Sequence, residues 1–138
     1  MIQLHGSESP KLVHEIKMRY GLPVMKAVGI SSESDLDKVK SFWEVCDQIL
    51  FDAKPANRHA LPGGNGVQFD WSILSNRSWS KPWMLAGGLN ASNVQTAVKL
   101  TNAKQLDLSS SVELSPGIKD ATKMKNFMQA LDNFNFGN

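Results

Sequence analysis

The sequence predicts an α/β fold in which a parallel sheet is built from repeated strand–helix units. Short apolar segments of strand length alternate five times with segments whose apolar residues recur at helical spacing. Spread over 138 residues, the units take about 28 residues each, close to the ~30 residues of a βαβ unit. Such units close into a barrel of eight or form an open sheet, and in both cases ligands bind at the carboxyl ends of the strands.

Five strands are predicted, over residues 2–6, 22–30, 49–53, 83–86 and 106–110. The first alternates apolar and polar residues, the next three are short, mainly apolar segments typical of strands, and the last is Leu106-Asp107-Leu108-Ser109-Ser110. After the first strand, Ser7 is a candidate helix N-cap with Pro10 in the first turn, and Gly21 is a candidate left-handed C-cap. We expect residues 1–138 to form a single domain.

The later helices are predicted from apolar stripes. A second helix should carry Cys46 at its end, residues 69–74 should open a short helix, and two further stripes comprise Val94, Ala97, Val98 and Thr101, then Met124, Phe127, Met128 and Leu131. Residues 54–68 form an irregular segment with Gly63, Gly64 and Gly66. Its length exceeds the usual strand–helix connection of about two to six residues, which predicts a functional loop.

A candidate anion site follows the strand at 83–86. Two glycines, Gly87 and Gly88, end this strand, and we call them the glycine turn; a helical pattern begins directly afterwards. Helix N-termini leave backbone N–H groups unpaired, and glycines allow close approach, so the junction suits a phosphate or carboxylate. Many such turns carry glycine and bind nothing, so a purely structural turn is the alternative.

Composition excludes several classes of protein. Fifteen Lys and Arg against thirteen Asp and Glu give a net charge of +2, too small for a nucleic-acid or membrane-surface footprint. Cys46 is the single cysteine and only three histidines are present, so we expect neither disulfides nor a metal site. With no signal sequence or membrane span recognisable, we expect a cytoplasmic protein. Cys46 precedes a strand, so a buried core thiol fits better than a nucleophile.

Polar side chains stand at several strand ends. Asp52 follows an apolar run and is a candidate general acid, or else a loop cap. Gln3 and His5 in the first strand and Asp107 in the last occupy similar positions. A single strand-end histidine is more often structural, but four polar residues converging on one edge favour a site.

Ser109, Ser110 and Ser111, which we call the serine turn, follow the last predicted strand. In a parallel sheet they would lie beside the glycine turn. Eight-stranded barrels commonly hold phosphate with the loops after the last two strands, which favours a shared anion site. A plain polar turn is the alternative.

Five motifs occur in order: Gln3-Leu4-His5-Gly6; Leu50-Phe51-Asp52-Ala53-Lys54; Gly63-Gly64-Asn65-Gly66 with Phe69-Asp70-Trp71; Leu85-Ala86-Gly87-Gly88-Leu89-Asn90 with Asn93-Val94; and Asp107-Leu108-Ser109-Ser110-Ser111-Val112-Glu113 with Pro116-Gly117 and Lys119-Asp120. Together they closely resemble the phosphoribosylanthranilate isomerase family of tryptophan biosynthesis. The resemblance implies a partial (β/α)8 TIM barrel, with five βα units corresponding to strands 4 to 8. It also implies an aldose–ketose isomerase, an intramolecular oxidoreductase without cofactor or metal, that acts on a small phosphoribosyl substrate.

The resemblance also implies roles for these residues. Asp52 looks like the general acid that opens the ribose ring, and the glycine and serine turns look like the phosphate site. Gln3, His5 and Asp107 match substrate-binding positions, and the glycines at 63, 64 and 66 match a loop over the site. The family usually has glycine where Ser111 stands, and a side chain there could disturb the turn if positive φ is needed.

The resemblance begins at the family's fourth strand, so the units that carry its cysteine base and an arginine are not among these motifs. We therefore expect a truncated chain that is a poor catalyst alone and is complemented by an N-terminal fragment. The alternative is a non-catalytic half-barrel that binds a phosphorylated ligand or self-associates. No nucleic-acid or membrane partner is expected.

Overall fold

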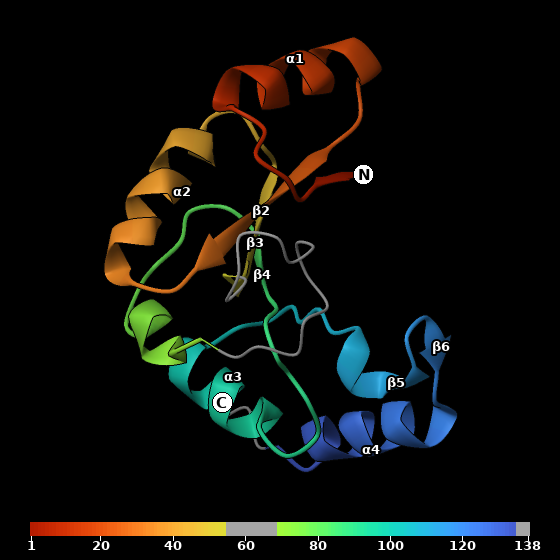
Figure 1. The fold of residues 1–138 in the computed structure, drawn as a ribbon. Helices are drawn as coiled ribbons and strands as arrows, with labels where there is room; N and C mark the ends of the chain where they lie inside the picture. The colour runs from red at the N-terminus through yellow and green to blue at the C-terminus, as the bar shows by residue number, and fades with distance from the viewer. Residues whose placement is uncertain (55–68, 135–138) are drawn as a thin grey trace.

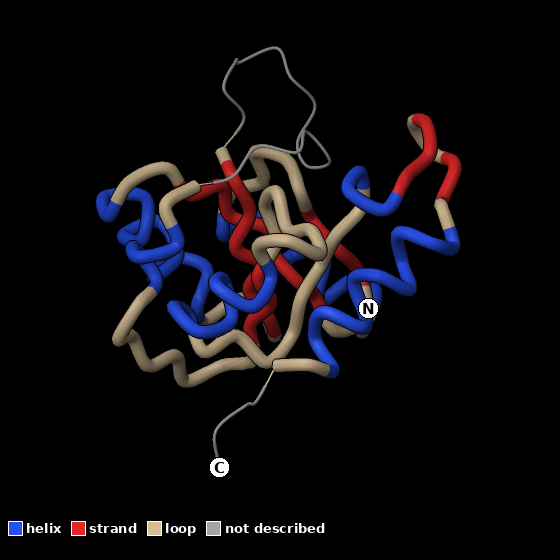
Figure 2. The backbone as a smooth tube through the Cα atoms, turned by 90° about the horizontal axis from the view of Figure 1, so that it is seen from below, coloured by secondary structure: helices blue, strands red, loops and turns tan. Residues whose placement is uncertain are grey.

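The computed structural model, shown in Figure 1, describes residues 1–54 and 69–134. Four strands, β1 (Ile2–Leu4), β2 (Val24–Ile30), β3 (Gln48–Ala53) and β4 (Trp83–Leu85), pair in that order and all in parallel. The α/β class and four of the predicted strands are thus confirmed. A short antiparallel hairpin of β5 (Glu113–Ser115) and β6 (Ile118–Lys119) projects from the body of the molecule in Figure 2.

Four α-helices are present in the described residues: α1 (Pro10–Tyr20), α2 (Leu36–Trp43), α3 (Val94–Thr101) and α4 (Ala121–Asp132). Single 3₁₀ turns are η1 (Glu33–Asp35), η2 (Trp71–Leu74) and η3 (Ser110–Val112). In Figure 1, α1, α2 and α3 follow one another in an arc along one side of the strands. Every helix in residues 1–54 and 69–134 falls short of the length and apolar character needed to cross a membrane.

The two central strands, β2 and β3, are buried on both faces, since alternate residues of a strand point to opposite sides and nearly all of theirs are buried. Val28, Ile49 and Phe51 join the large core beneath the helices. Leu50 and Ala27 belong to a smaller cluster on the other face, with Met25 and Ala86. The continuous apolar runs of the sequence match this two-sided burial.

The prediction of a fifth strand over residues 106–110 was wrong in extent. Leu106 forms only one parallel bridge, with Leu85. Two hydrogen bonds support it, from the Leu85 N–H to the Gln105 carbonyl (2.9 Å) and from the Asp107 N–H to the Leu85 carbonyl (2.8 Å). At Ser109 the backbone leaves the extended region, with φ −132° and ψ −77°, and the chain turns into η3. The fifth segment thus keeps the place of a strand beside β4 but not its length.

Two helix boundaries also differ from the predictions. Ser9, not Ser7, is the N-cap of α1, because its hydroxyl accepts from the Leu12 N–H at 3.2 Å. The C-cap of α1 is Gly21 with φ 61°, as predicted. α2 ends at Trp43, so Cys46 lies in the turn before β3, where it is fully buried. The expected short helix after residue 69 is the 3₁₀ turn η2.

Gly87 is the glycine on which the position of the next turn depends. Its φ is 86°, and a Cβ there would lie 2.7 Å from the backbone nitrogen of Ala53. The turn after β4 is therefore packed directly against the end of β3. Gly117 has a similar φ of 81°, but a Cβ there would meet nothing within 4 Å.

These two glycines form a matched pair for a stability measurement. Gly117→Ala should cost only the left-handed backbone strain, about 1–2 kcal/mol. Gly87→Ala should cost at least ~1 kcal/mol more, because the backbone must also move away from Ala53. Urea unfolding of both variants measures the difference, and equal losses would show that the close approach at Gly87 is not a constraint.

Candidate functional site

A histidine–aspartate pair lies at the carboxyl end of the sheet. The Asp52 side chain, at the end of β3, is 9% exposed, and its Oδ2 lies 3.2 Å from Nε2 of His5, which follows β1. Oδ1 of Asp52 accepts the Ala53 N–H at 2.8 Å. β2 lies between these strands, and Gly29 near its end is in register with Asp52. The two side chains meet across β2, at a position where this strand carries no side chain.

Gln3 orients the other side of the imidazole. Its Nε2 lies 3.4 Å from Nδ1 of His5, and the two residues share a face of the strand because they are two apart. The Gln3 amide can turn either its NH₂ or its oxygen toward Nδ1, so this contact is compatible with both the neutral and the charged imidazole. In both forms an Nε2–H can donate to the Asp52 carboxyl group.

Asp107 interacts electrostatically with the histidine–aspartate pair, although it is an exposed residue. Loss of hydration and the nearby charge of Asp52 raise the pKa of Asp107, while the charges of His5 and Lys119 act in the opposite direction. The structure thus places Gln3, His5 and Asp52 in contact, and Asp107 within electrostatic influence of His5 and Asp52.

The glycine turn presents unpaired backbone donors. The N–H groups of Gly87 and Gly88 donate to no acceptor within the described residues. The Gly88 carbonyl, in contrast, accepts from the side-chain amides of Asn93 (2.9 Å) and Asn90 (3.4 Å). No role was predicted for these two asparagines, although they stand two and five residues after Gly88.

The expected helix N-terminus at the glycine turn was wrong. α3 begins only at Val94, whose N–H donates to the Asn90 carbonyl at 3.0 Å. An intervening turn, in which Asn93 Oδ1 accepts the Asn90 N–H at 2.8 Å, separates the glycines from the helix. Free N–H groups of the glycine turn itself, rather than those of α3, are the donors available at this point.

The serine turn also has backbone N–H groups without an acceptor. Within the described residues, the N–H groups of Ser110 and Ser111 donate to no acceptor, and the buried Ser111 hydroxyl has no hydrogen-bond partner. Ser109 is held in place by Lys119, because Lys119 Nζ donates to both its carbonyl and its hydroxyl at 3.0 Å. Ser111 does not have positive φ, so its side chain causes no left-handed strain.

The remaining candidates lie elsewhere. Gly63, Gly64 and Gly66, predicted to form a loop over the site, fall outside the described residues. Cys46 precedes β3 and so lies at the opposite end of this strand from Asp52; burial raises the pKa of its thiol. A buried core thiol is therefore confirmed. Among residues 1–54 and 69–134, no three His, Cys, Asp or Glu side chains are grouped as metal ligands would be.

A known protein family matches most of this chain. Residues 1–130 match the model of the N-(5′-phosphoribosyl)anthranilate (PRA) isomerase family. An N-(5′-phosphoribosyl)anthranilate isomerase of Cereibacter sphaeroides is 55% identical over 129 residues, which make up 94% of this chain and 61% of that protein.

Solved structures of the same family are also similar. Phosphoribosyl anthranilate isomerase from Thermotoga maritima aligns with a TM-score of 0.74 at 34% identity, over 94% of this chain and 60% of that one. A phosphoribosyl anthranilate isomerase in complex with reduced 1-(o-carboxyphenylamino)-1-deoxyribulose 5-phosphate aligns with a TM-score of 0.72 at 33% identity, over 94% and 58%. The chain thus spans about 60% of the length of the relatives it matches.

The coupling of Asp107 to the histidine–aspartate pair is testable by titration. Asp52→Asn should lower the pKa of Asp107, because it removes a neighbouring negative charge, and His5→Gln should raise it, because it removes an opposing positive one. Carboxyl ¹³C NMR as a function of pH measures both shifts. Asp37→Asn, on the exposed face of α2, is the control and should leave Asp107 unchanged; shifts of the same sign in the two test variants would contradict the coupling.

Proposed function

Because the chain belongs to the N-(5′-phosphoribosyl)anthranilate isomerase family, we propose that it carries the acid and phosphate-binding parts of such an isomerase. The reaction is the Amadori rearrangement of N-(5-phosphoribosyl)anthranilate to 1-(2-carboxyphenylamino)-1-deoxyribulose 5-phosphate in tryptophan biosynthesis. The observation that carries the proposal is the buried Asp52, held by His5 at the carboxyl end of a parallel sheet. A lone buried thiol fits function in a reducing cytoplasm.

Asp52 is the general acid in this proposal. Its carboxyl proton passes to the ribose ring oxygen as the bond from that oxygen to C1 breaks, and the nitrogen lone pair forms the C=N bond of a Schiff base. A base then takes the C2 proton, and the resulting enolamine tautomerises to the 2-keto sugar. The hydrogen bonds to His5 and to the Ala53 N–H fix the carboxyl in one orientation. No group of the described residues is assigned as the base.

The substrate phosphate lies between the glycine and serine turns in this proposal. Both turns leave backbone N–H groups unpaired, and the buried Ser111 hydroxyl also lacks a partner among the described residues. Phosphate oxygens accept from such donors. Gln3, His5 and Asp107 then face the remainder of the substrate, beside Asp52.

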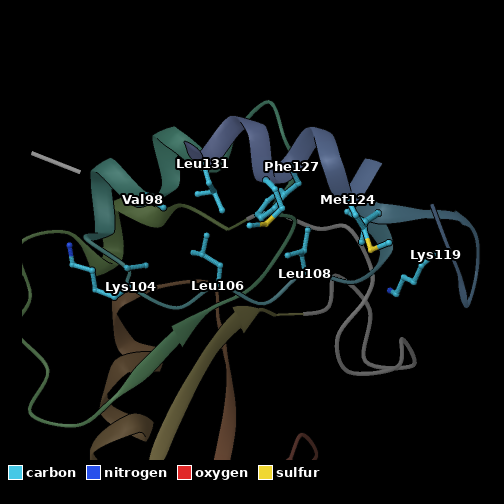
Figure 3. Close-up of a pocket in the computed structure, with 11 residues that line it drawn as sticks. Val98, Lys104, Leu106, Leu108, Lys119, Met124, Phe127 and Leu131 are labelled. Carbon is cyan, nitrogen blue, oxygen red and sulfur yellow. The ribbon is translucent and has the colours of Figure 1, made fainter. Parts of the chain in front are cut away.

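We further propose that the fold is the last five βα units of an eight-unit barrel, with the strand of the fifth reduced to the bridge at Leu106. The open edge beside this bridge continues into an apolar groove of about 560 Å³, which Figure 3 shows beneath α4. Its lining includes Leu106, Leu108, Met124, Phe127, Met128 and Leu131. Met124 and Met128 are 42% and 55% exposed, although they belong to the stripe predicted to be buried.

The proposed occupant of the groove is a chain segment that supplies a strand and a helix of the first three βα units, including the cysteine base. Chain length supports this occupant, since about 40% of each of two solved relatives lies outside the part that matches this chain. An apolar groove at an unpaired strand edge suits the outer face of one further strand and the apolar face of a helix. A second copy of this chain is the competing occupant.

Turnover of N-(5-phosphoribosyl)anthranilate tests the proposed function. The chain alone should be a poor catalyst, and mixing it with a chain of the first three units should restore turnover. In the restored enzyme, Asp52→Asn should lower kcat by about 10²- to 10⁴-fold, the usual effect of losing a general acid, with Asp37→Asn as the control. No turnover in any mixture, or full activity of Asp52→Asn, would overturn the proposal.

The groove makes a separate prediction. Met128→Glu should weaken complementation by at least about tenfold in the concentration needed for half-maximal activity, because it places a charge in an apolar contact. Leu100→Glu on α3, which is 43% exposed and outside the groove lining, is the matched control. Equal behaviour of the two variants would contradict docking at the groove, and a stable dimer of this chain alone would identify a second copy as the occupant.

A further inference from the structure

Lys119, on β6, reaches back from the hairpin to the serine turn. Its Nζ donates to the Ser109 carbonyl (3.0 Å), the Ser109 hydroxyl (3.0 Å) and Oε1 of Glu113 (2.7 Å). The Ser109 hydroxyl lies 3.3 Å from the same carboxylate oxygen. Lys123 holds the main chain of Glu113 from the other side, with Nζ 2.6 Å from its carbonyl oxygen. The hairpin is thus bonded to Ser109 of the serine turn, and the start of α4 is bonded to the hairpin.

This arrangement makes Lys119 unsuitable as a direct anion ligand. An ammonium group has three N–H donors, and all three have acceptors here. Glu113 also neutralises its charge, and the hydrogen bond from Lys119 is the main reason why the pKa of Glu113 is lowered. The pair therefore affects the serine turn mainly by fixing its conformation, and adds little net positive charge.

The geometry concerns the direction of the Ser109 peptide. Its carbonyl accepts from Lys119 and also from the Val112 N–H at 3.3 Å. Ser109 has φ −132° and ψ −77°, outside the helical and extended regions, and such conformations persist only where the surroundings enforce them. With this carbonyl held, the following N–H groups, those of Ser110 and Ser111, remain unpaired within the described residues.

We propose that Lys119 and Glu113 are positioning residues that hold the Ser109 carbonyl and hydroxyl, so that the serine turn presents its free N–H groups and the Ser111 hydroxyl to a phosphate. This inference rests on the proposed phosphate site and goes beyond it by assigning residues outside both turns. Neither residue touches the ligand. Their effect on binding is carried by the orientation of the turn.

Binding of inorganic phosphate to the chain, followed by NMR titration, separates geometry from charge. Lys119→Met should weaken binding about five- to tenfold, the effect of losing about one hydrogen bond. Glu113→Ala should weaken it as well, although this substitution removes a negative charge near the anion. If the pair acted through charge, Glu113→Ala would tighten binding instead, and that result would overturn the proposal.

Two further variants complete this experiment. Lys125→Met removes an exposed lysine of α4 and should leave the affinity within about twofold, since one distant charge is screened. Lys119→Arg keeps donors for the same acceptors and should restore at least part of the affinity lost in Lys119→Met. Equal weakening by Lys119→Met and Lys125→Met would show a general charge effect and contradict the proposal.

A measurement without ligand keeps this inference separate from the phosphate proposal. Hydrogen exchange of the Val112 amide, whose N–H donates to the Ser109 carbonyl, should accelerate in Lys119→Met and Glu113→Ala but not in Lys125→Met. If wild-type chain binds no phosphate while exchange behaves in this way, the phosphate site fails and the positioning role stands. Unchanged exchange in both test variants would overturn the positioning role, whatever the affinity for phosphate.

Discussion

The close approach of Gly87 to Ala53 is the contact on which the arrangement of the candidate site depends. It sets the turn after β4 directly against the end of β3, one residue from Asp52. The same contact therefore fixes the distance between the acid and the glycine turn. Only glycine combines a φ of 86° with this lack of space. The contact thus holds the candidate acid, Asp52, and the donors of the glycine turn next to each other.

Much of this could be read from the sequence, because the signals were local. Alternation predicted the first strand and apolar runs predicted the next three, and a parallel sheet places all of their carboxyl ends on one edge. The meeting of Asp52 and His5 follows from that rule. Gly21 could be predicted in the same way, because the residue after a helix often adopts a left-handed conformation and glycine does so without strain.

What the sequence did not predict depends on contacts between distant residues. The apolar run at 106–108 looks like a strand, but its pairing ends after one bridge because Ser109 turns the chain toward η3. That turn is held by Lys119, ten residues later. In the same way, Asn93 holds the Gly88 carbonyl and delays the start of α3. Periodicity carries no information on such side-chain-to-backbone bonds.

The two turns share a chemical asymmetry. In each, a carbonyl oxygen is already occupied by the protein's own donors, Asn93 at Gly88 and Lys119 at Ser109, while neighbouring N–H groups stay open. A pocket of this kind would offer donors but few acceptors. A fully ionised phosphate monoester needs only donors, whereas its singly protonated form brings a P–OH that also seeks an acceptor. Held in this way, the proposed site would distinguish the two ionisation states of its ligand and favour the dianion.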